Sequence, residues 1–330
     1  MKISILGCGS WATALAHVFS LNGHQVSLYG RNADAFDNEK HINLKYFPDI
    51  RLSSLISYTT SLSHSLDHAD MILFCVPSIA MREMARKVNA LLDHEVMILS
   101  AAKGFDPETL EPLSYVLKEE LDGRYVKGIV SLIGPSFATE VIHDKVTTIC
   151  AVSSDVEASK EVQNCFSNNQ FRIYTNDDEI GSQCAAALKN VIAIAGGAIY
   201  GLGEGENAKA GLVTRGIQEM IRFGVAIGGR KETFMGLTGV GDLLLTCSSM
   251  SSRNYSLGYE IGKHDDASVV LKNNTKTCEG VATCKYAYDL ALKKKIDMPI
   301  VSSVYRVLYL NERPSLCLKD TMMRKLKSEL

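Results

Sequence analysis

A lysine and an asparagine stand side by side in the middle of an apolar stretch, Gly181–Ala198. Small and apolar residues run all round the helix that this stretch predicts, which is typical of a helix buried on every side. A buried ammonium group must find a partner, lose its charge or face water, and burial lowers the pKa of a lysine toward the range of a general acid or base. Lys189 is therefore a candidate for proton transfer, with Asn190 beside it. The alternative is a lysine whose stem carries its ammonium group to the surface.

A glycine-rich turn predicts a second function, the binding of a dinucleotide. The short apolar strand Lys2–Leu6 runs into GCGSWA at residues 7–12, and a helix from about Ser10 to Leu21 and a strand at Gln25–Tyr29 follow. In this setting the first glycine makes the tight turn, the second lets a pyrophosphate approach the backbone, and Ala12 allows close packing of helix on strand. The start of the helix supplies N–H groups and a positive dipole end to the phosphates.

The residues after the second strand bear on the choice of cofactor. Folds that bind NAD usually have Asp or Glu there to hold the ribose 2′-hydroxyl, whereas this chain has Gly30-Arg31-Asn32. A cation at this position suits a 2′-phosphate, so we expect NADP(H) to be accepted. The alternative for Arg31 is a solvated surface arginine.

Polar residues also follow two later strands. Lys103 comes after the strand Val96–Ala101, and Gly134 and Ser136 come after the strand Ile129–Ile133. In a doubly wound sheet ligands lie beyond the carboxyl ends of the strands, which is where these residues are expected. Taken alone, Lys103 is better explained as a surface lysine.

The second half of the chain adds a carboxylate and a small polar cluster. Asp242 follows two glycines, which indicate a close approach of the backbone to another group. Ser252, Arg253 and Asn254 place a hydroxyl, a fork of donors and an amide in succession, and arginine pairs phosphate oxygens bidentately. This cluster predicts a site for a small anion, with a polar turn as the alternative.

The elements that position these residues divide the chain into two parts. Strands alternate with helices up to about residue 176, which predicts a doubly wound, Rossmann-type parallel sheet. Further strands are expected at Asp70–Pro77, Thr147–Val152 and Phe171–Tyr174, and further helices at about 79–92, 108–121, 156–168 and 212–228. We therefore predict a dinucleotide-binding α/β domain over residues 1–178 and an all-α substrate-binding domain over residues 179–330.

Composition restricts the class of protein. The formal net charge of −2 gives no support to a nucleic-acid partner. The nine cysteines are an odd number without a CxxC pair, which favours a reducing cytoplasm and predicts no metal site. The stretch Met1–Leu21 superficially resembles a secretory signal, but glycines break its apolar run and we interpret it as mature structure. No segment has 18 uninterrupted apolar residues, so no membrane insertion is expected.

Taken together, these motifs resemble one family over nearly the whole chain: the soluble NAD(P)-dependent glycerol-3-phosphate dehydrogenases, particularly the bacterial form. The similarity runs in order through GCGSWATALA, FPD, CVPS, AAKGF, GPSFATE, FRIYTND, AAALKNVIAIAGG, NAKAGLVTRG, GVGDLLLTC, SSRNYSLG and CEG. Departures are mild. Ala12 and Ala102 replace commoner neighbours, and Tyr255 follows Ser-Arg-Asn where the family often has a basic residue.

The resemblance implies reversible hydride transfer between NADP(H) or NAD(H) and the C2 atom of dihydroxyacetone phosphate or sn-glycerol 3-phosphate, supplying phospholipid synthesis. It implies three catalytic residues, with Lys189 as the proton donor in reduction and Asp242 and Lys103 orienting it. The implied cofactor-binding residues are Gly7, Gly9, Ser10, Trp11, Arg31, Lys103, Ala138, Arg253, Thr277 and Glu279. The implied substrate-binding residues are Lys103, Gly134, Ser136, Lys189, Asn190, Asp242, Ser252, Arg253 and Asn254.

Two alternatives remain from the sequence. A hydroxyacid or ketoacid reductase of the same two-domain plan also uses a lysine on the interdomain helix, and an unphosphorylated substrate would distinguish it. A binding module that has lost catalysis is the other, although Lys189 and Asp242 are both present. Family and size favour a homodimer, which we expect in the cytoplasm.

Overall fold

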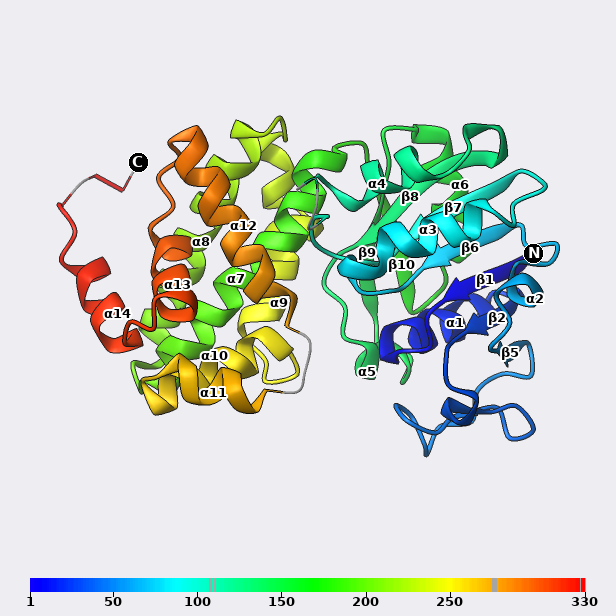
Figure 1. Cartoon of the computed structure of the whole chain (residues 1–330), viewed down its shortest axis with the longest axis horizontal. Helices are drawn as coiled ribbons and strands as arrows, with labels where there is room; N and C mark the ends of the chain where they lie inside the picture. The colour runs from blue at the N-terminus through cyan, green and yellow to red at the C-terminus, as the bar shows by residue number, and fades with distance from the viewer. Residues whose placement is uncertain (107–108, 110, 275–277, 327, 330) are drawn as a thin grey trace. The chain divides into compact units, whose positions relative to one another are not determined.

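The structure is a computed structural model that describes residues 1–106, 109, 111–274, 278–326 and 328–329. The chain divides into two compact units, Met1–Gln183 and Cys184–Leu330, and the division falls inside helix α7 (Glu179–Gly201). The first unit combines a sheet with helices, and the second is helical, without a strand among its described residues (Figure 1). The predicted α/β domain followed by an all-α domain is therefore confirmed, while the boundary after residue 178 stays a prediction.

A single large sheet forms the centre of the first unit. Its spatial order is β10-β9-β8-β7-β6-β1-β2-β5. The bounds are β1 (Lys2–Leu6), β2 (Gln25–Tyr29), β5 (Ile56–Thr59), β6 (Met71–Phe74), β7 (Val96–Ser100), β8 (Val126–Ile133), β9 (Thr147–Val152) and β10 (Phe171–Asn176). Because β1 lies between β2 and β6, the strand order reverses at β1, and ligands of such sheets bind at the carboxyl ends beside this reversal.

One strand pair departs from the parallel sheet that the sequence predicts. β8 and β9 run antiparallel, with Ser131 opposite Val152, whereas the other neighbouring strands of this sheet are parallel. A parallel return needs a crossover that runs back along the sheet, usually a full helix. The connection here contains only α5 (Ala138–Val141), which is too short for that return.

Helices cover both faces of the sheet. Besides α5 they are α1 (Ser10–Leu21), α2 (Leu62–Leu66), α3 (Met81–Asn89), α4 (Leu113–Glu120) and α6 (Val156–Phe166). Neighbouring residues of a strand face opposite sides, so Met71 and Leu73 of β6 pack in the core that contains α1 and α6. Ile72 and Phe74 pack in the core that contains α3 and α4. Burial on both faces explains why such strands are apolar without interruption.

Three strands are absent from the sequence prediction. β5 lies at the edge of the sheet beside β2, and β3 (Phe36–Asp37) and β4 (Ile42–Asn43) form a separate antiparallel ribbon. The ribbon strands have two residues each, too few for a periodic pattern. This short ribbon nevertheless contains a fully buried asparagine, Asn43, which is considered below.

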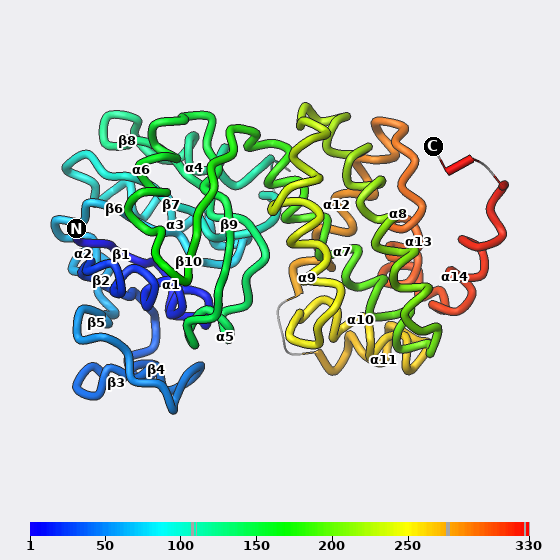
Figure 2. The backbone as a smooth tube through the Cα atoms, turned by 180° about the vertical axis from the view of Figure 1, so that it is seen from behind, coloured from blue at the N-terminus to red at the C-terminus, as the bar shows by residue number. Residues whose placement is uncertain are grey.

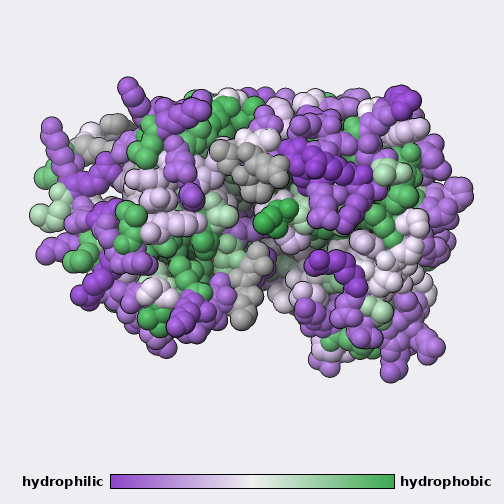
Figure 3. Space-filling model, viewed as in Figure 1, coloured by the Kyte–Doolittle hydropathy of each residue, from purple (hydrophilic) through white to green (hydrophobic). Residues whose placement is uncertain are grey.

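The second unit is a group of helices with α7 near its middle (Figures 1 and 2). The others are α8 (Gly205–Ala226), α9 (Asp242–Cys247), α10 (Arg253–His264), α11 (Ala267–Asn273), α12 (Glu279–Lys294), α13 (Pro299–Tyr309) and α14 (Pro314–Met322). By length and composition α7 could cross a membrane, with a mean hydropathy of 1.4, but 78% of its apolar window is buried inside the structure. It is therefore the core helix of this unit. Hydrophilic residues dominate the visible face of each unit (Figure 3).

Glycines allow α7 and α10 to touch backbone to backbone. A Cβ atom on Gly258 would lie 2.0 Å from the carbonyl oxygen of Ile194, and one on Gly262 would lie 2.0 Å from that of Ala198. These distances exclude any side chain at the two positions without displacement of a helix. Both contacts advance by one turn along both helices, so α7 and α10 run side by side in the same direction.

Candidate active site

The glycine loop between β1 and α1 has a positive φ at Gly7, where the sequence predicts a tight turn. Gly7 has φ +132°, and a Cβ there would lie 2.5 Å from the carbonyl oxygen of Cys75. Its N–H donates to the carbonyl oxygen of Tyr29 at the end of β2, at 2.9 Å. Only glycine combines this φ with so close a neighbour, so the loop is fixed at the carboxyl end of β1.

The following residues fit the phosphates of a dinucleotide. Gly9 precedes α1 with no side chain capping the helix, and the first turn contains no acidic residue. A Cβ on Gly9 would meet nothing within 4 Å, so the backbone is open to a ligand there. The indole N–H of Trp11 is buried and has no hydrogen-bond partner among the described residues. Uncapped N–H groups and an available buried donor together suit an anion at this helix N-terminus.

The other candidate residues of the first unit follow the carboxyl ends of neighbouring strands. Arg31 is exposed just after β2, and half-buried Lys103 comes after β7. Gly134 is buried directly after β8, and the hydroxyl of half-buried Ser136 donates to its carbonyl oxygen at 3.1 Å. Ala138 is half-buried at the start of α5. The structure thus groups them at one edge of the sheet, which is the edge where ligands of this fold bind.

Lys189 of α7 and Asp242 of α9 form a buried ion pair. The ammonium group contacts Asp242 Oδ2, and the two side chains are only 4% and 1% exposed. The buried lysine has therefore found a charged partner, and the alternative of a lysine reaching the surface is wrong. A carboxylate beside an ammonium group favours its charged, proton-carrying form.

The local backbone places Asp242 at this point. The π-helical turn Leu237–Gly241 leads into α9, and Asp242 is the first residue of that helix, where a negative charge is favourable. The hydroxyl of Thr246 donates to the carbonyl oxygen of Asp242 at 2.6 Å and lies 3.5 Å from its Oδ1 atom. No pattern in the sequence assigns a role to Thr246.

Asn190, the residue after Lys189, belongs to a network of hydrogen-bonded amides. Asn254 Nδ2 donates to Asn190 Oδ1 at 3.0 Å, and the backbone N–H of Gly280 donates to Asn254 Oδ1 at 3.0 Å. Asn190 Nδ2 in turn donates to the carbonyl oxygen of Ala186 at 3.3 Å. Both asparagines are buried, and the network joins α7, α10 and the start of α12. Asn190 and Asn254 are one turn before the Ile194–Gly258 contact. The row of backbone contacts between α7 and α10 at Gly258 and Gly262, here called the glycine seam, therefore sets their spacing.

The remaining candidates of the second unit lie close to these groups in sequence. Ser252 caps α10 by accepting a hydrogen bond from the N–H of Tyr255 at 3.3 Å, and Arg253 is exposed beside it. Glu279 is the first residue of α12. Thr277, predicted to contact the cofactor, lies outside the described residues.

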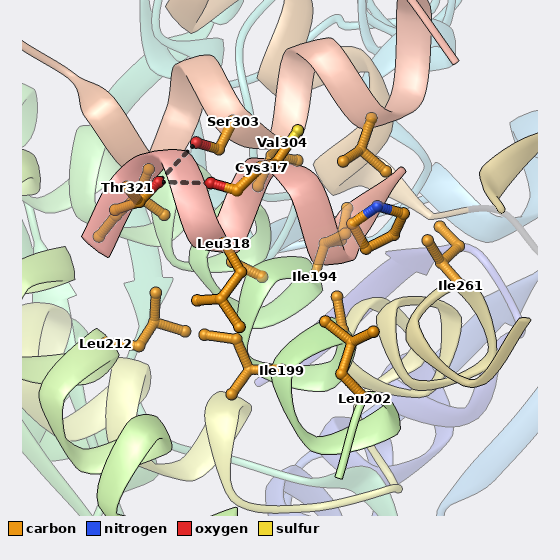
Figure 4. Close-up of a pocket in the computed structure, with 15 residues that line it drawn as sticks. Ile194, Ile199, Leu202, Leu212, Ile261, Ser303, Val304, Cys317, Leu318 and Thr321 are labelled. Atoms are coloured by element: carbon orange, nitrogen blue, oxygen red, sulfur yellow. Dashed lines mark hydrogen bonds between the residues drawn. The ribbon is translucent and has the colours of Figure 1, made fainter. Parts of the chain in front are cut away.

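A separate apolar cavity of about 80 Å³ lies between α7, α13 and α14. Leu318 and Ile199 point toward one another in it, and the hydroxyls of Ser303 and Thr321 are 3.1 Å apart at one side (Figure 4). None of the candidate site residues lines this cavity. It is therefore distinct from the Lys189 ion pair.

Both halves of the chain match one family. Residues 2–159 match the family model described as NAD-dependent glycerol-3-phosphate dehydrogenase N-terminus, and residues 178–319 match that described as its C-terminus. A glycerol-3-phosphate dehydrogenase [NAD(P)+] of Streptococcus agalactiae is 43% identical over 330 residues, covering 99% of this chain and 98% of that protein. One from Streptococcus pyogenes is 45% identical over 310 residues, covering 93% of this chain and 92% of that protein.

A solved structure agrees with this result. The crystal structure of glycerol-3-phosphate dehydrogenase from Coxiella burnetii has a TM-score of 0.91 and 34% sequence identity, and the match covers 98% of this chain and 99% of that one. The two family models together with the overall similarity of sequence and fold thus point to the same family. The chain belongs to the family of NAD-dependent glycerol-3-phosphate dehydrogenases.

Proposed function

We propose that this chain reduces dihydroxyacetone phosphate to sn-glycerol 3-phosphate, and catalyses the reverse oxidation, with NADPH or NADH. The observation that carries the proposal is the buried Lys189–Asp242 pair in a chain of this family. The product is a building block of phospholipids.

In the direction of reduction, Lys189 donates a proton to the C2 oxygen of the ketone. When bound, the nicotinamide supplies the hydride for C2, so the carbonyl becomes a hydroxyl by gaining one hydride and one proton. Asp242 pairs with the ammonium group and holds it in place between turnovers. In oxidation Lys189 accepts the proton again.

Binding is divided among the remaining candidates. The glycine loop with Ser10 and Trp11 binds the cofactor phosphates, and Arg31 binds the 2′-phosphate where one is present. Ser252, Arg253 and Asn254 hold the substrate, with Arg253 pairing the phosphate oxygens. The remaining proposed contacts with cofactor and substrate are made by Lys103, Gly134, Ser136, Ala138, Thr277 and Glu279.

The test mixes the purified protein with NADPH and dihydroxyacetone phosphate and follows the loss of reduced-nicotinamide absorbance. We expect turnover that requires the phosphate, and a fall in kcat of at least ~10²-fold in Lys189→Ala. Lys127→Ala removes a surface lysine paired with Glu161 and serves as the matched control. Repeating the assay with NADH and with Arg31→Ser measures the contribution of Arg31 to cofactor choice.

Binding distinguishes a loss of chemistry from a loss of fold. Trp11 is the single tryptophan of the chain and lies in the first turn of α1, directly after the glycine loop, so its fluorescence reports NADPH binding directly. Absence of turnover with dihydroxyacetone phosphate while NADPH still binds would refute the proposed reaction. Turnover of unphosphorylated ketoacids would then favour the hydroxyacid reductases.

We also infer a homodimer in the cytoplasm. The odd number of cysteines without a CxxC pair supports a reducing compartment, and the size of the chain and its family support association into pairs. Light scattering coupled to gel filtration tests the dimer, and a monomer at working concentrations would contradict it.

A further inference from the structure

Asn43, in the two-residue strand β4, has every hydrogen-bonding position of its side chain occupied. It is fully buried, and its Nδ2 atom donates to the carbonyl oxygen of Cys8 at 3.0 Å and to Thr13 Oγ1 at 2.8 Å. Its Oδ1 atom accepts from the backbone N–H groups of Lys45 at 3.2 Å and Tyr46 at 3.1 Å. An amide has two N–H donors and two oxygen lone pairs, so nothing on this side chain is left over. Backbone N–H groups can only donate, which fixes the orientation of the amide.

The two donors of Asn43 are directed at the glycine loop. Cys8 lies between the two glycines, and Thr13 lies in the first turn of α1. The hydroxyl of Thr13 accepts a hydrogen bond from Asn43 and itself donates to the carbonyl oxygen of Gly9 at 3.0 Å. Asn43 thus holds the Cys8 carbonyl directly, and Thr13 holds the Gly9 carbonyl with both its hydroxyl and its backbone N–H, each at 3.0 Å.

Because the peptide bond is planar, fixing a carbonyl group also fixes the direction of the N–H group in the same peptide. In a trans peptide the C=O and N–H bonds point to opposite sides. The Cys8 carbonyl points at Asn43, so the N–H of Gly9 points away from it. The Gly9 carbonyl points at Thr13, so the N–H of Ser10 points away from that side chain. These are two of the N–H groups at the start of α1 that suit an anion.

We propose that Asn43 is a positioning residue that orients the Gly9 and Ser10 N–H groups toward the cofactor pyrophosphate. It acts through Cys8 and Thr13. The inference rests on the proposed function only in that the glycine loop binds the dinucleotide. It does not depend on which substrate is reduced.

The test compares variants by calorimetric titration with NADPH and with ADP-ribose, which has the pyrophosphate but no nicotinamide. We expect Asn43→Ala to raise the Kd of both ligands by about tenfold, which is close to the loss of one charge-assisted hydrogen bond. Thr13→Val keeps the shape of the side chain and removes its hydroxyl, and we expect a rise in the same direction, whereas Thr13→Ser restores binding. With saturating NADPH, the KM for dihydroxyacetone phosphate stays within about twofold of the original value.

A control lies in the connection between the two ribbon strands, where the exposed Asn38 directly follows β3. Asn38 bridges backbone groups as Asn43 does, but its partners are the carbonyl oxygen and the N–H of Tyr58, at 2.9 and 2.8 Å. Asn38→Ala therefore disturbs the ribbon without touching the glycine loop, and we expect an unchanged Kd. The emission of Trp11 in the ligand-free protein should shift in Asn43→Ala and not in Asn38→Ala.

Two outcomes would overturn the proposal. The first is an Asn43→Ala protein that unfolds at lower temperature yet binds NADPH and ADP-ribose with the original Kd. The second is an equal rise of Kd in Asn38→Ala, which would assign the effect to the ribbon as a whole. Failure of the proposed reaction would show instead as missing turnover with normal ligand binding, so the two failures are distinguishable.

Discussion

Glu219 of α8 is a carboxyl group buried at the start of another helix. Its side chain accepts hydrogen bonds from the backbone N–H groups of Ile300 at 2.7 Å and Val301 at 3.2 Å, in the first turn of α13. Burial raises the pKa of Glu219 from 4.5 to about 7, and the two N–H donors oppose the rise only in part. We predict that the folded protein gains stability as the pH falls through this range, and that Glu219→Gln abolishes the gain.

The sign and size follow from proton linkage. The folded protein holds this proton more tightly than the unfolded chain, so lowering the pH between about 7 and 4.5 favours the folded state. The whole shift is equivalent to about 3 kcal/mol, because one pKa unit corresponds to about 1.4 kcal/mol. Between about pH 8 and about pH 6 the gain from this one group is about 1.3 kcal/mol.

The assay is urea unfolding followed by far-UV circular dichroism at about pH 8 and about pH 6, for both proteins. Other titrating groups affect both proteins alike, so the change in their difference in unfolding free energy isolates Glu219. Glu206→Gln removes an exposed carboxylate on the same helix and serves as the control. If the original protein and Glu219→Gln shift in parallel, Glu219 is ionised at both pH values and the N–H donors of α13 outweigh burial, which would refute the reasoning.

Two further predictions concern packing in the helical unit. Asp242→Ala should lower the unfolding free energy by about 3–5 kcal/mol, because the Lys189 ammonium group stays buried without this carboxylate. Urea titration measures the loss, and if combining Lys189→Met with Asp242→Leu recovers none of it, burial of the charge is not its cause. Gly258→Ala should cost about 1–3 kcal/mol or more, because its Cβ would lie 2.0 Å from the carbonyl oxygen of Ile194. In Gly211→Ala the Cβ meets nothing within 4 Å, and we expect a gain of about 0.5–1 kcal/mol, so equal thermal shifts would contradict the backbone contact.

The sequence predicts the fold best where turn-forming residues stand at both ends of a clear apolar pattern. The bounds of β1, α1, β2 and β9 are those expected, because glycines or charged turns end each apolar run. The direction of β9 was not predictable from its own residues. It depends on whether the preceding connection has room for a full helix, and four-residue α5 does not provide one.

The sequence offers candidate site residues, but it does not show which of them are in contact. Lys189 stood out because an ammonium group in an apolar helix needs an explanation, and Asp242 because it follows two glycines. Their pairing joins segments far apart in the chain, and no local pattern encodes it. Asn43 gave no signal at all, since a two-residue strand has no periodicity and its partners are a carbonyl group and a hydroxyl elsewhere in the sequence.

The small residues of α7 explain more than its burial. In the sequence these residues indicate a helix that is buried on all sides. In the structure their spacing also allows close contact with one neighbour, α10. Two helices in backbone contact have little freedom to slide along one another. A small shift would already move each glycine of α10 away from the carbonyl group that it faces on α7. The 3.0 Å bond between Asn190 and Asn254 lies one turn further along this seam. A side chain at Gly258 would therefore separate the two amides beside Lys189 as it destabilises the fold, so in this unit the precision of the site and the packing of the core depend on the same contact.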